Sequence, residues 1–223
     1  PLGVNRNIGK GWRMLPAKYQ GLGLPNYTLE CLITKINFLQ KHWGIKNPPG
    51  EFLRQEYEAL QIEVGLYGDV LGHAWETVGE LATKNTWFEN LWHLCSHFGI
   101  KIHMAKPESL GPVREGDVSL MAAFWDMGFR GTDLKRINRV RKFLCLLHKS
   151  DLVACDGRTV MDEVYDRTEG ESTGHRFPME QPEGRDFCLW TRVVEVLCRE
   201  GKLLQEVGKY VKIPHVRWQW SAS

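Results

Sequence analysis

Two histidines form the most suggestive metal-binding pattern of this chain. His93 and His97 lie four residues apart, and this spacing lets two imidazoles on one helix face hold a zinc ion. The glutamate that a zinc hydrolase carries next to its first histidine is absent, and the third ligand would have to be His103 or a distant acid. We therefore interpret the pair as partly exposed helix histidines that flank a buried Cys95. We expect no bound metal and no other cofactor.

The other patterns that carry catalysis are absent from the sequence. There is no Gly-x-Ser-x-Gly turn for a nucleophile, and the six cysteines stand singly, without Cys-x-x-Cys spacing. The Gly9-Lys10-Gly11 segment is too short for a phosphate-binding loop. No Asp-Asp pair or carboxylate cluster is visible that could hold the two metal ions of a polymerase. The sequence predicts that this chain is not an enzyme, and a stand-alone hydrolase or metal enzyme is the weakest alternative.

The clearest helical pattern of the chain is basic and spans residues 134–148. At 100° per residue, one side of this helix is apolar, with Leu134, Ile137, Val140, Leu144 and Leu147. The opposite side carries Lys135, Arg139, Lys142 and Lys149 within about 80° of one another.

No acid lies between Asp133 and Asp151, so the sequence offers these cations no partner one helical turn away. We expect unpaired cations that either contact phosphates or form a solvated or protein-facing stripe. Their replacement by glutamine should then leave the fold intact. Arg141 lies nearer the apolar edge, and we expect it to pair instead with an acid from elsewhere in the chain.

Charge alternates in sign along the chain, although the net charge is only +2. Residues 1–50 hold seven Lys or Arg against one acid, and residues 131–149 hold six against one. Residues 51–130 hold six against twelve, and residues 150–223 hold ten against thirteen. The two basic segments are either chance unevenness of a solvated surface or a face for a polyanion.

The hydrophobic periodicity predicts a mainly α fold. We expect an irregular helical bundle with a loop-rich N-terminal segment and at most one or two short β-hairpins. Helices are predicted from Asn26 or Thr28 to Trp43, over 51–64, over 87–98 with Thr86 at its start, from the cap Asp117 to Met127, over 134–148 and from the cap Asp186 to about Cys198. The helix over 87–98 should bury a face with Phe88, Leu91, Trp92, Cys95 and Phe98. The last helix should bury a face with Phe187, Trp190, Val193, Val194 and Leu197. Asp156-Gly157 suits the turn of a small hairpin within 152–160.

Composition divides the chain into four regions. These are a loop-rich beginning (1–26), a helical domain (27–165), an exposed linker (166–185), and a last helix with a Trp-rich tail (186–223). No run of apolar residues is long enough to span a membrane, so we expect no membrane partner. Single cysteines favour a reducing compartment, which predicts an intracellular protein, cytoplasmic or nuclear. The first residue is proline, and we expect a piece of a longer chain.

Residues 13–25 resemble a stretch that follows the polymerase core of non-LTR retrotransposon reverse transcriptases. In that family a basic residue and a spacer lead into Gly-Gly-Leu-Gly, an apolar residue and often proline. Gln20 stands where the first glycine is usual. The five residues that fit the motif are Gly21, Leu22, Gly23, Leu24 and Pro25. Three later stretches, 137–143, 150–157 and 215–220, also resemble the downstream part of such polyproteins.

The resemblance implies a thumb and post-thumb segment of an RNA-directed DNA polymerase from a transposable element. The paired aspartates of the family's catalytic signature are absent, so the implied role is non-catalytic binding of a template–primer backbone. The implied partners are RNA, DNA or an RNA–DNA hybrid, and the upstream palm domain. The predicted nucleic-acid-binding residues are Lys10, Arg13, Lys18, Lys135, Arg136, Arg139, Lys142 and Lys149. The alternative is a helical protein-interaction module that uses its basic stripe.

Overall fold

In a computed structural model, the chain is mainly helical, as predicted. The structure describes residues 10–19, 23–82, 86–104, 114, 116–154, 159–165, 167 and 181–199. The α-helices are α1 (Lys10–Met14), α2 (Tyr27–His42), α3 (Pro48–Val64), α4 (Trp75–Val78), α5 (Trp87–His97), α6 (Leu120–Asp126), α7 (Gly131–Phe143) and α8 (Gly184–Arg199). Single turns of 3-10 helix are η1 (Ala17–Tyr19), η2 (Val70–Gly72), η3 (Gly79–Leu81), η4 (Lys149–Leu152) and η5 (Asp162–Tyr165).

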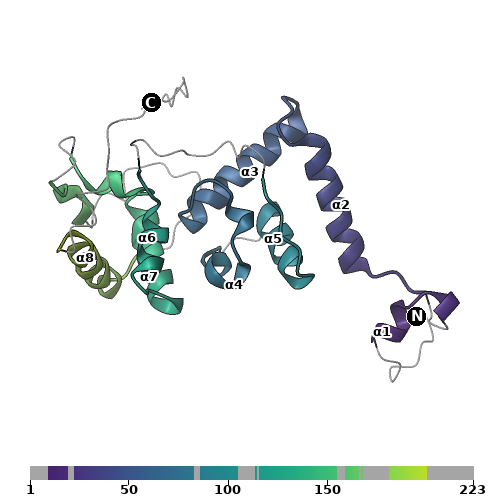
Figure 1. Cartoon of the computed structure of the whole chain (residues 1–223). Coiled ribbons are helices and arrows are strands. Elements are labelled where there is room, and N and C mark those ends of the chain that lie inside the picture. The colour runs from purple at the N-terminus through teal and green to yellow at the C-terminus, as the bar shows by residue number, and fades with distance from the viewer. Residues whose placement is uncertain are drawn as a thin grey trace.

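The helices follow one another across an elongated molecule (Figure 1). At one end α1 stands away from the other helices, and the long rod of α2 connects it to them. Helices α2, α3 and α5 pack together in the middle, and α7 packs against α8 at the far end. The described residues of the two basic segments, 1–50 and 131–149, therefore lie in different parts of the molecule.

Capping residues set the ends of α2 and α3. Asn26 caps α2 by accepting a hydrogen bond from the Leu29 amide at 3.3 Å, which confirms one of the two predicted starts. Asn47 caps α3, and Pro48 and Pro49 occupy its first turn. The predicted start of α3 at residue 51 was therefore wrong. Proline is tolerated at these positions because their amides have no partner within the helix.

Helix α5 agrees with its prediction. Thr86 and Glu89 form a reciprocal capping box, in which each side chain accepts a hydrogen bond from the other residue's amide. The inner face buries Phe88, Leu91 and Cys95, as the helical spacing predicts. This face packs against α2 and α3.

Helix α6 does not begin as predicted, because Asp117 does not cap it. Ser119 precedes the helix, and Asp117 is buried beneath η4. There the Asp117 carboxylate accepts hydrogen bonds from the amide and hydroxyl of Ser150. Asp117 therefore connects two segments 33 residues apart, which no local capping signal reveals.

Helix α7 ends well before its predicted end at His148. Cys145 has a left-handed φ of +57°. The amides of Cys145 and Leu146 donate to the carbonyls of Lys142 and Arg141 at 3.1 and 3.0 Å. These bonds form a Schellman motif, which ends a helix by satisfying its last carbonyls. The apolar periodicity continues past this point with Leu144 and Leu147, so it does not indicate where the helix ends.

One hydrophobic core runs from α2 to α8. Trp190 is fully buried on α8, where its ring meets Phe124 edge-to-face at 5.8 Å and its indole N–H donates to the Val164 carbonyl at 2.9 Å. The predicted inner face of the last helix is confirmed. Its buried residues are Phe187, Trp190, Val193, Val194 and Leu197.

Three predicted features lie partly or wholly outside the described residues. The predicted hairpin is represented by an antiparallel bridge between Val153 and Val160, whereas 155–158 are not described. Of the predicted linker, residues 167 and 181–185 are described, and α8 already begins at Gly184. The Trp-rich tail, residues 200–223, lies outside the described residues.

Arg141 joins the end of α3 to the end of α7. Its buried guanidinium donates to the side chain of Asn138 at 2.8 Å and to the carbonyls of Ile62, Glu63 and Leu146. Burial lowers the pKa of Arg141 to about 10, so the group stays charged at neutral pH. This arginine completes the hydrogen bonds of two helix ends and does not face solvent.

Candidate nucleic-acid interface

The cations predicted on α7 meet acids from other elements. Lys135 lies 3.0 Å from Glu80 of η3, although both side chains remain about half exposed. Lys142 lies 2.9 Å from Glu63 of α3, and both of these side chains are largely buried. Each of these two cations therefore has a carboxylate partner that is distant in sequence.

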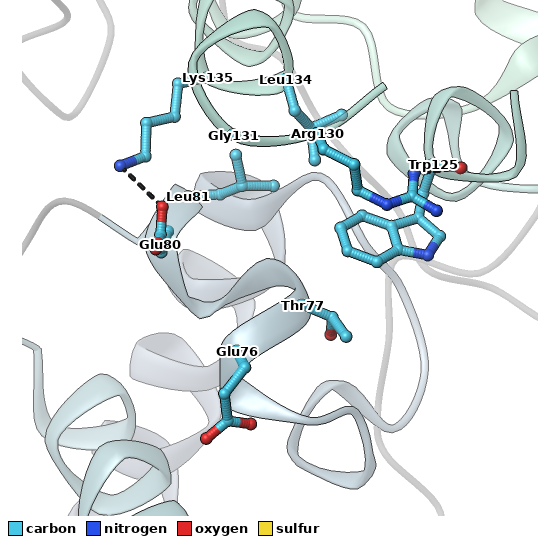
Figure 2. A pocket seen from close by; sticks show the side chains of 9 residues that line it. All are labelled: Glu76, Thr77, Glu80, Leu81, Trp125, Arg130, Gly131, Leu134 and Lys135. Carbon is cyan, nitrogen blue, oxygen red and sulfur yellow. Dashed lines mark hydrogen bonds and ion pairs between the residues drawn. The ribbon is translucent and has the colours of Figure 1, made fainter. Parts of the chain in front are cut away.

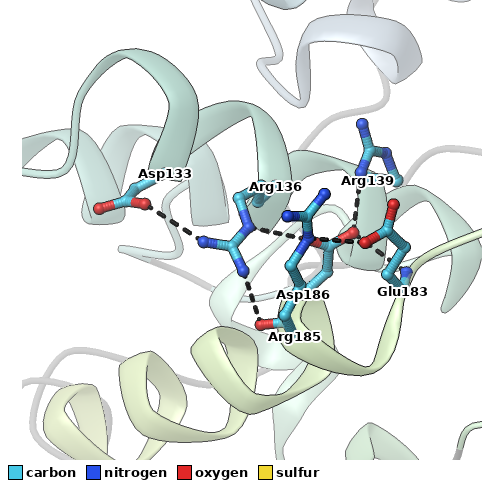
Figure 3. A network of polar contacts seen from close by, with 6 residues as sticks. All are labelled: Asp133, Arg136, Arg139, Glu183, Arg185 and Asp186. Atoms are coloured by element: carbon cyan, nitrogen blue, oxygen red, sulfur yellow. Dashed lines mark hydrogen bonds and ion pairs between the residues drawn. The ribbon is translucent and has the colours of Figure 1, made fainter.

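Asp186 is the acid that two arginines of α7 share (Figure 3). Its fully buried carboxylate accepts from Arg136 Nε at 2.8 Å through one oxygen and from Arg139 Nη1 at 2.8 Å through the other. The Glu183 amide donates to the second oxygen at 3.1 Å, and Arg136 also donates to the Arg185 carbonyl at 2.9 Å. This network fastens the first turn of α8 to the middle of α7.

Electrostatics favours the ionised form of Asp186. Burial opposes ionisation of this carboxylate, but the hydrogen bonds from Arg136, the Glu183 backbone and Arg139 outweigh it and lower the pKa below its ordinary value of 3.8. At neutral pH the carboxylate therefore carries a full negative charge, which compensates part of the positive charge of the two arginines.

Lys149 does not belong to the face on which it was predicted. Because α7 ends early, Lys149 lies in η4 and is only 5% exposed. Its amide donates to the Val118 carbonyl at 3.0 Å. The structure therefore does not group Lys149 with the cations of α7.

The expectation of unpaired cations on this helix was thus wrong. Acids 47 to 79 residues away in sequence supply the partners for Arg139 and Lys142, and an inspection of neighbouring positions cannot find them. Arg136 has a further, local partner in Asp133 at 3.7 Å. Whether the α7 residues contact nucleic acid stays a prediction, but much of their charge is already neutralised within the fold.

The other predicted cations lie in a segment that we call the N-terminal arm, residues 10–46. It contains six Lys or Arg against a single acid, Glu30. Lys18, Lys41 and Lys46 are exposed. Arg13 is half-buried. The side chain of Lys10 in α1, the third predicted cation of this region, is outside the described atoms.

Backbone hydrogen bonds close the beginning of the arm into a compact loop. The amides of Gly23 and Leu24 donate to the carbonyls of Leu15 and Arg13, both at 2.9 Å. Gly23 has a φ of +62°, a conformation that glycine adopts without steric cost. The described part of the predicted Gly-Leu-Gly-Leu-Pro motif thus shapes a turn, whereas Gly21 and Leu22 are not described. Pro25, its last residue, is exposed and leads into α2.

Sequence reasoning missed two aromatic side chains of the arm. Tyr19 is 57% exposed and Tyr27 is 79% exposed, whereas Tyr57 in the core is fully buried. The Lys18 ammonium lies 4.9 Å from the centre of the Tyr19 ring. Tyr19 and Tyr27 lie in or next to a basic, loop-rich segment. This position is the sequence signal that could have indicated the exposure of the two rings.

A small cavity lies between η3, α4 and the start of α7 (Figure 2). Its volume is about 130 Å³, below the range of roughly 300–1,000 Å³ that is usual for ligand pockets. The Arg130 guanidinium covers the Trp125 ring at 3.5 Å, and Lys135 pairs with Glu80 across the other side. The charged side chains that line the cavity thus pair with other lining residues, and the cavity is too small for a nucleotide.

The two histidines of the possible zinc site are both exposed on α5, and Cys95 between them is buried. His103 lies 2.8 Å from the Asp69 carboxylate instead of joining them. Within the described part of the chain, no three His, Cys, Asp or Glu side chains are grouped to hold a metal ion. The prediction that the chain binds no metal stays a prediction.

No protein-family model, curated protein or solved structure matches this chain. Among the described helices, none is both long and apolar enough to cross a membrane.

Proposed function

We propose that this chain is a non-catalytic nucleic-acid-binding segment whose N-terminal arm contacts the sugar–phosphate backbone. The observation that carries the proposal is the exposure of Lys18, Lys41 and Lys46 in a segment with only one acid. Lysines attract phosphates as flexible point charges, and the release of counterions adds to the affinity. Contacts of this kind fix a position on the backbone without reading the base sequence.

The length of α2 suits a ligand with regularly spaced charges. Its 16 residues span about 24 Å at 1.5 Å per residue. Lys18 precedes this rod, and Lys41 and Lys46 lie at its other end. At 3.4 Å per phosphate along one strand, the rod covers about seven phosphates. A polyanion of this length can therefore contact cations at both ends of the rod.

Because residues 13–25 resemble a stretch of non-LTR reverse transcriptases, the proposal includes that the chain is a segment of such a polyprotein. In that setting the arm would belong to the thumb, next to a palm domain of the same polyprotein, and would bind RNA, DNA or their hybrid. An intracellular location suits the five described cysteines, none of which forms a disulfide within the described part of the chain.

The competing function is a helical module that binds an acidic protein. The sequence assigned this function to the basic stripe of α7. In the structure, the cations of that stripe pair with acids of the same chain. An acidic protein would have to use the arm instead. The experiment below therefore includes polyglutamate as a second ligand.

The test compares two double variants that remove the same charge. Lys41→Gln/Lys46→Gln changes the arm, whereas Lys101→Gln/Arg192→Gln removes two exposed cations outside it. Fluorescence anisotropy at increasing salt gives the slope of log affinity against log salt. We expect the arm variant to lower this slope by about 1.4–1.8, because each lost phosphate contact contributes about 0.7–0.9. The control variant should change it little.

Two results would overturn the proposal. The first is a parent chain that binds no oligonucleotide at low salt. The second is an equal loss of affinity in both double variants, which would indicate that net charge alone attracts the ligand. Binding to polyglutamate without binding to any oligonucleotide would favour the protein-interaction module.

A further inference from the structure

We infer that the N-terminal arm binds single-stranded nucleic acid, with unpaired bases stacked on Tyr19 and Tyr27. This inference rests on the proposed function and names its ligand class. A duplex presents phosphates to a protein, but its bases are already stacked on one another. Only a strand with unpaired bases can use an exposed aromatic ring together with exposed cations.

The exposure of the two rings carries the first step. Tyr27 at 79% and Tyr19 at 57% are the two most exposed large apolar or aromatic side chains among the described residues. Other aromatic side chains of the chain serve the fold, as Tyr57 does by meeting Phe88 edge-to-face at 5.1 Å. Neither exposed tyrosine belongs to the hydrophobic core. Both rings are therefore accessible to a ligand.

The position of the two rings gives the second step. Tyr19 ends η1, and Tyr27 is the first residue of α2, directly after its cap. Between them, the Gly23 and Leu24 amides bind back to the carbonyls of Leu15 and Arg13, which holds the two rings on one small loop-closed unit. This unit stands at the end of the molecule, away from the helical core (Figure 1).

Charge next to the rings gives the third step. The Lys18 ammonium lies over the Tyr19 ring, 4.9 Å from its centre, so a cation and an aromatic ring are presented together. A nucleotide offers the matching pair, a phosphate and a base. Sequence-tolerant single-strand binding proteins combine these two contacts, because every base has a π-face. The charge of the arm, six cations against one acid, disfavours a cationic partner and suits a phosphate chain.

The experiment separates base stacking from phosphate contact by using strands that differ only in their bases. The ligands are labelled single-stranded oligodeoxyadenylate of about twelve nucleotides, an abasic strand of the same length, and the corresponding duplex. We expect the parent chain to bind oligodeoxyadenylate about tenfold or more tighter than the abasic strand. We also expect it to prefer the single strand to the duplex.

The variant Tyr19→Ser/Tyr27→Ser should abolish this preference and leave binding to the abasic strand unchanged. Its salt slope should equal that of the parent, since no phosphate contact is removed. Phe52→Ser removes a 43% exposed ring from α3, outside the arm, and is the matched control. Circular dichroism of both variants checks that the helices persist.

The outcomes distinguish this inference from the proposed function. Equal binding of the adenylate and abasic strands, or tighter binding of the duplex, overturns the stacking inference while the arm remains a backbone contact. A double tyrosine variant that keeps the parent's preference does the same. Failure of the parent to bind any of the three ligands at low salt overturns both proposals. Binding to polyglutamate alone would assign the arm to an acidic protein.

Discussion

The N-terminal arm and helix α7 have similar excesses of positive charge, yet the surroundings of their cations differ. On α7, Arg136 and Arg139 share the buried Asp186, and Lys142 meets Glu63. In the arm, Lys41 at the end of α2 and Lys46 just after it are exposed, and the arm carries only one acid. A count of charges along the sequence thus does not separate cations that hold a fold together from cations available to a ligand. Burial and the position of distant acids separate them.

The difference also predicts opposite responses to mutation. Removal of Arg139 or Lys142 deprives a buried carboxylate of a partner, which is costly. Removal of the exposed Lys41 or Lys46 leaves water in its place. The four predictions below test this contrast, beginning with the largest expected effect.

Trp190→Ala should destabilise the fold by about 3–5 kcal/mol, because it empties a fully buried site and removes a hydrogen bond to Val164. Denaturant titration measures the loss. The variant tests whether α8 is firmly packed beside the α7 arginines. A loss below about 1 kcal/mol would show that this packing contributes little.

Arg139→Gln/Lys142→Gln should cost about 2–4 kcal/mol, since Asp186 and Glu63 lose charged partners inside the fold. This replaces the sequence-based expectation that glutamines on this helix leave the fold intact. Thermal unfolding followed by circular dichroism provides the measurement, with Lys101→Gln/Arg192→Gln as the charge-matched control. Equal melting temperatures for the two double variants would contradict the structural role of the α7 cations.

Asp186→Asn should cost about 1–2 kcal/mol at neutral pH and should change the response to acid. Hydrogen bonds lower the pKa of Asp186 in the folded chain below 3.8, so the unfolded chain takes up this proton at a higher pH than the folded chain does. The stabilisation is complete well above pH 3.8 and is lost as the pH falls through the folded-state pKa. Melting temperatures between about pH 6 and pH 3 should fall less in the variant than in the parent.

Lys41→Gln/Lys46→Gln should change the free energy of unfolding by less than about 0.5 kcal/mol, because both side chains are exposed. The same titration as for Trp190→Ala measures it. A loss as large as that of the α7 double variant would remove the contrast between the two regions.

Local signals in the sequence predicted most of the fold. Asn26 and Thr86 cap their helices as predicted, and the apolar spacing around Trp190 identified the inner face of α8. These features depend on residues within one or two helical turns. The end of α7 was missed because Cys145 adopts a left-handed conformation that residues other than glycine rarely adopt.

The candidate site was less predictable because its deciding contacts are long-range. Asp186 lies 47 residues after Arg139, and Glu63 lies 79 residues before Lys142. Their meeting depends on how whole helices pack, and periodicity within one helix cannot reveal it. The exposure of Tyr19 and Tyr27 depends likewise on the beginning of the arm, which stands away from the core.

The glycine that ends α3 has a consequence for redesign of this chain. Gly65 has a φ of +71°, and a Cβ there would lie 2.4 Å from Met121 Cγ and 2.7 Å from Arg141 Nε. Saturation mutagenesis at position 65 should therefore recover glycine almost alone. A smaller residue at 141 would relieve only the second of these contacts and would leave the carbonyls of Ile62 and Leu146 without their donor. Positions 65 and 141 are therefore both restricted, and a library that varies either one will contain few folded members.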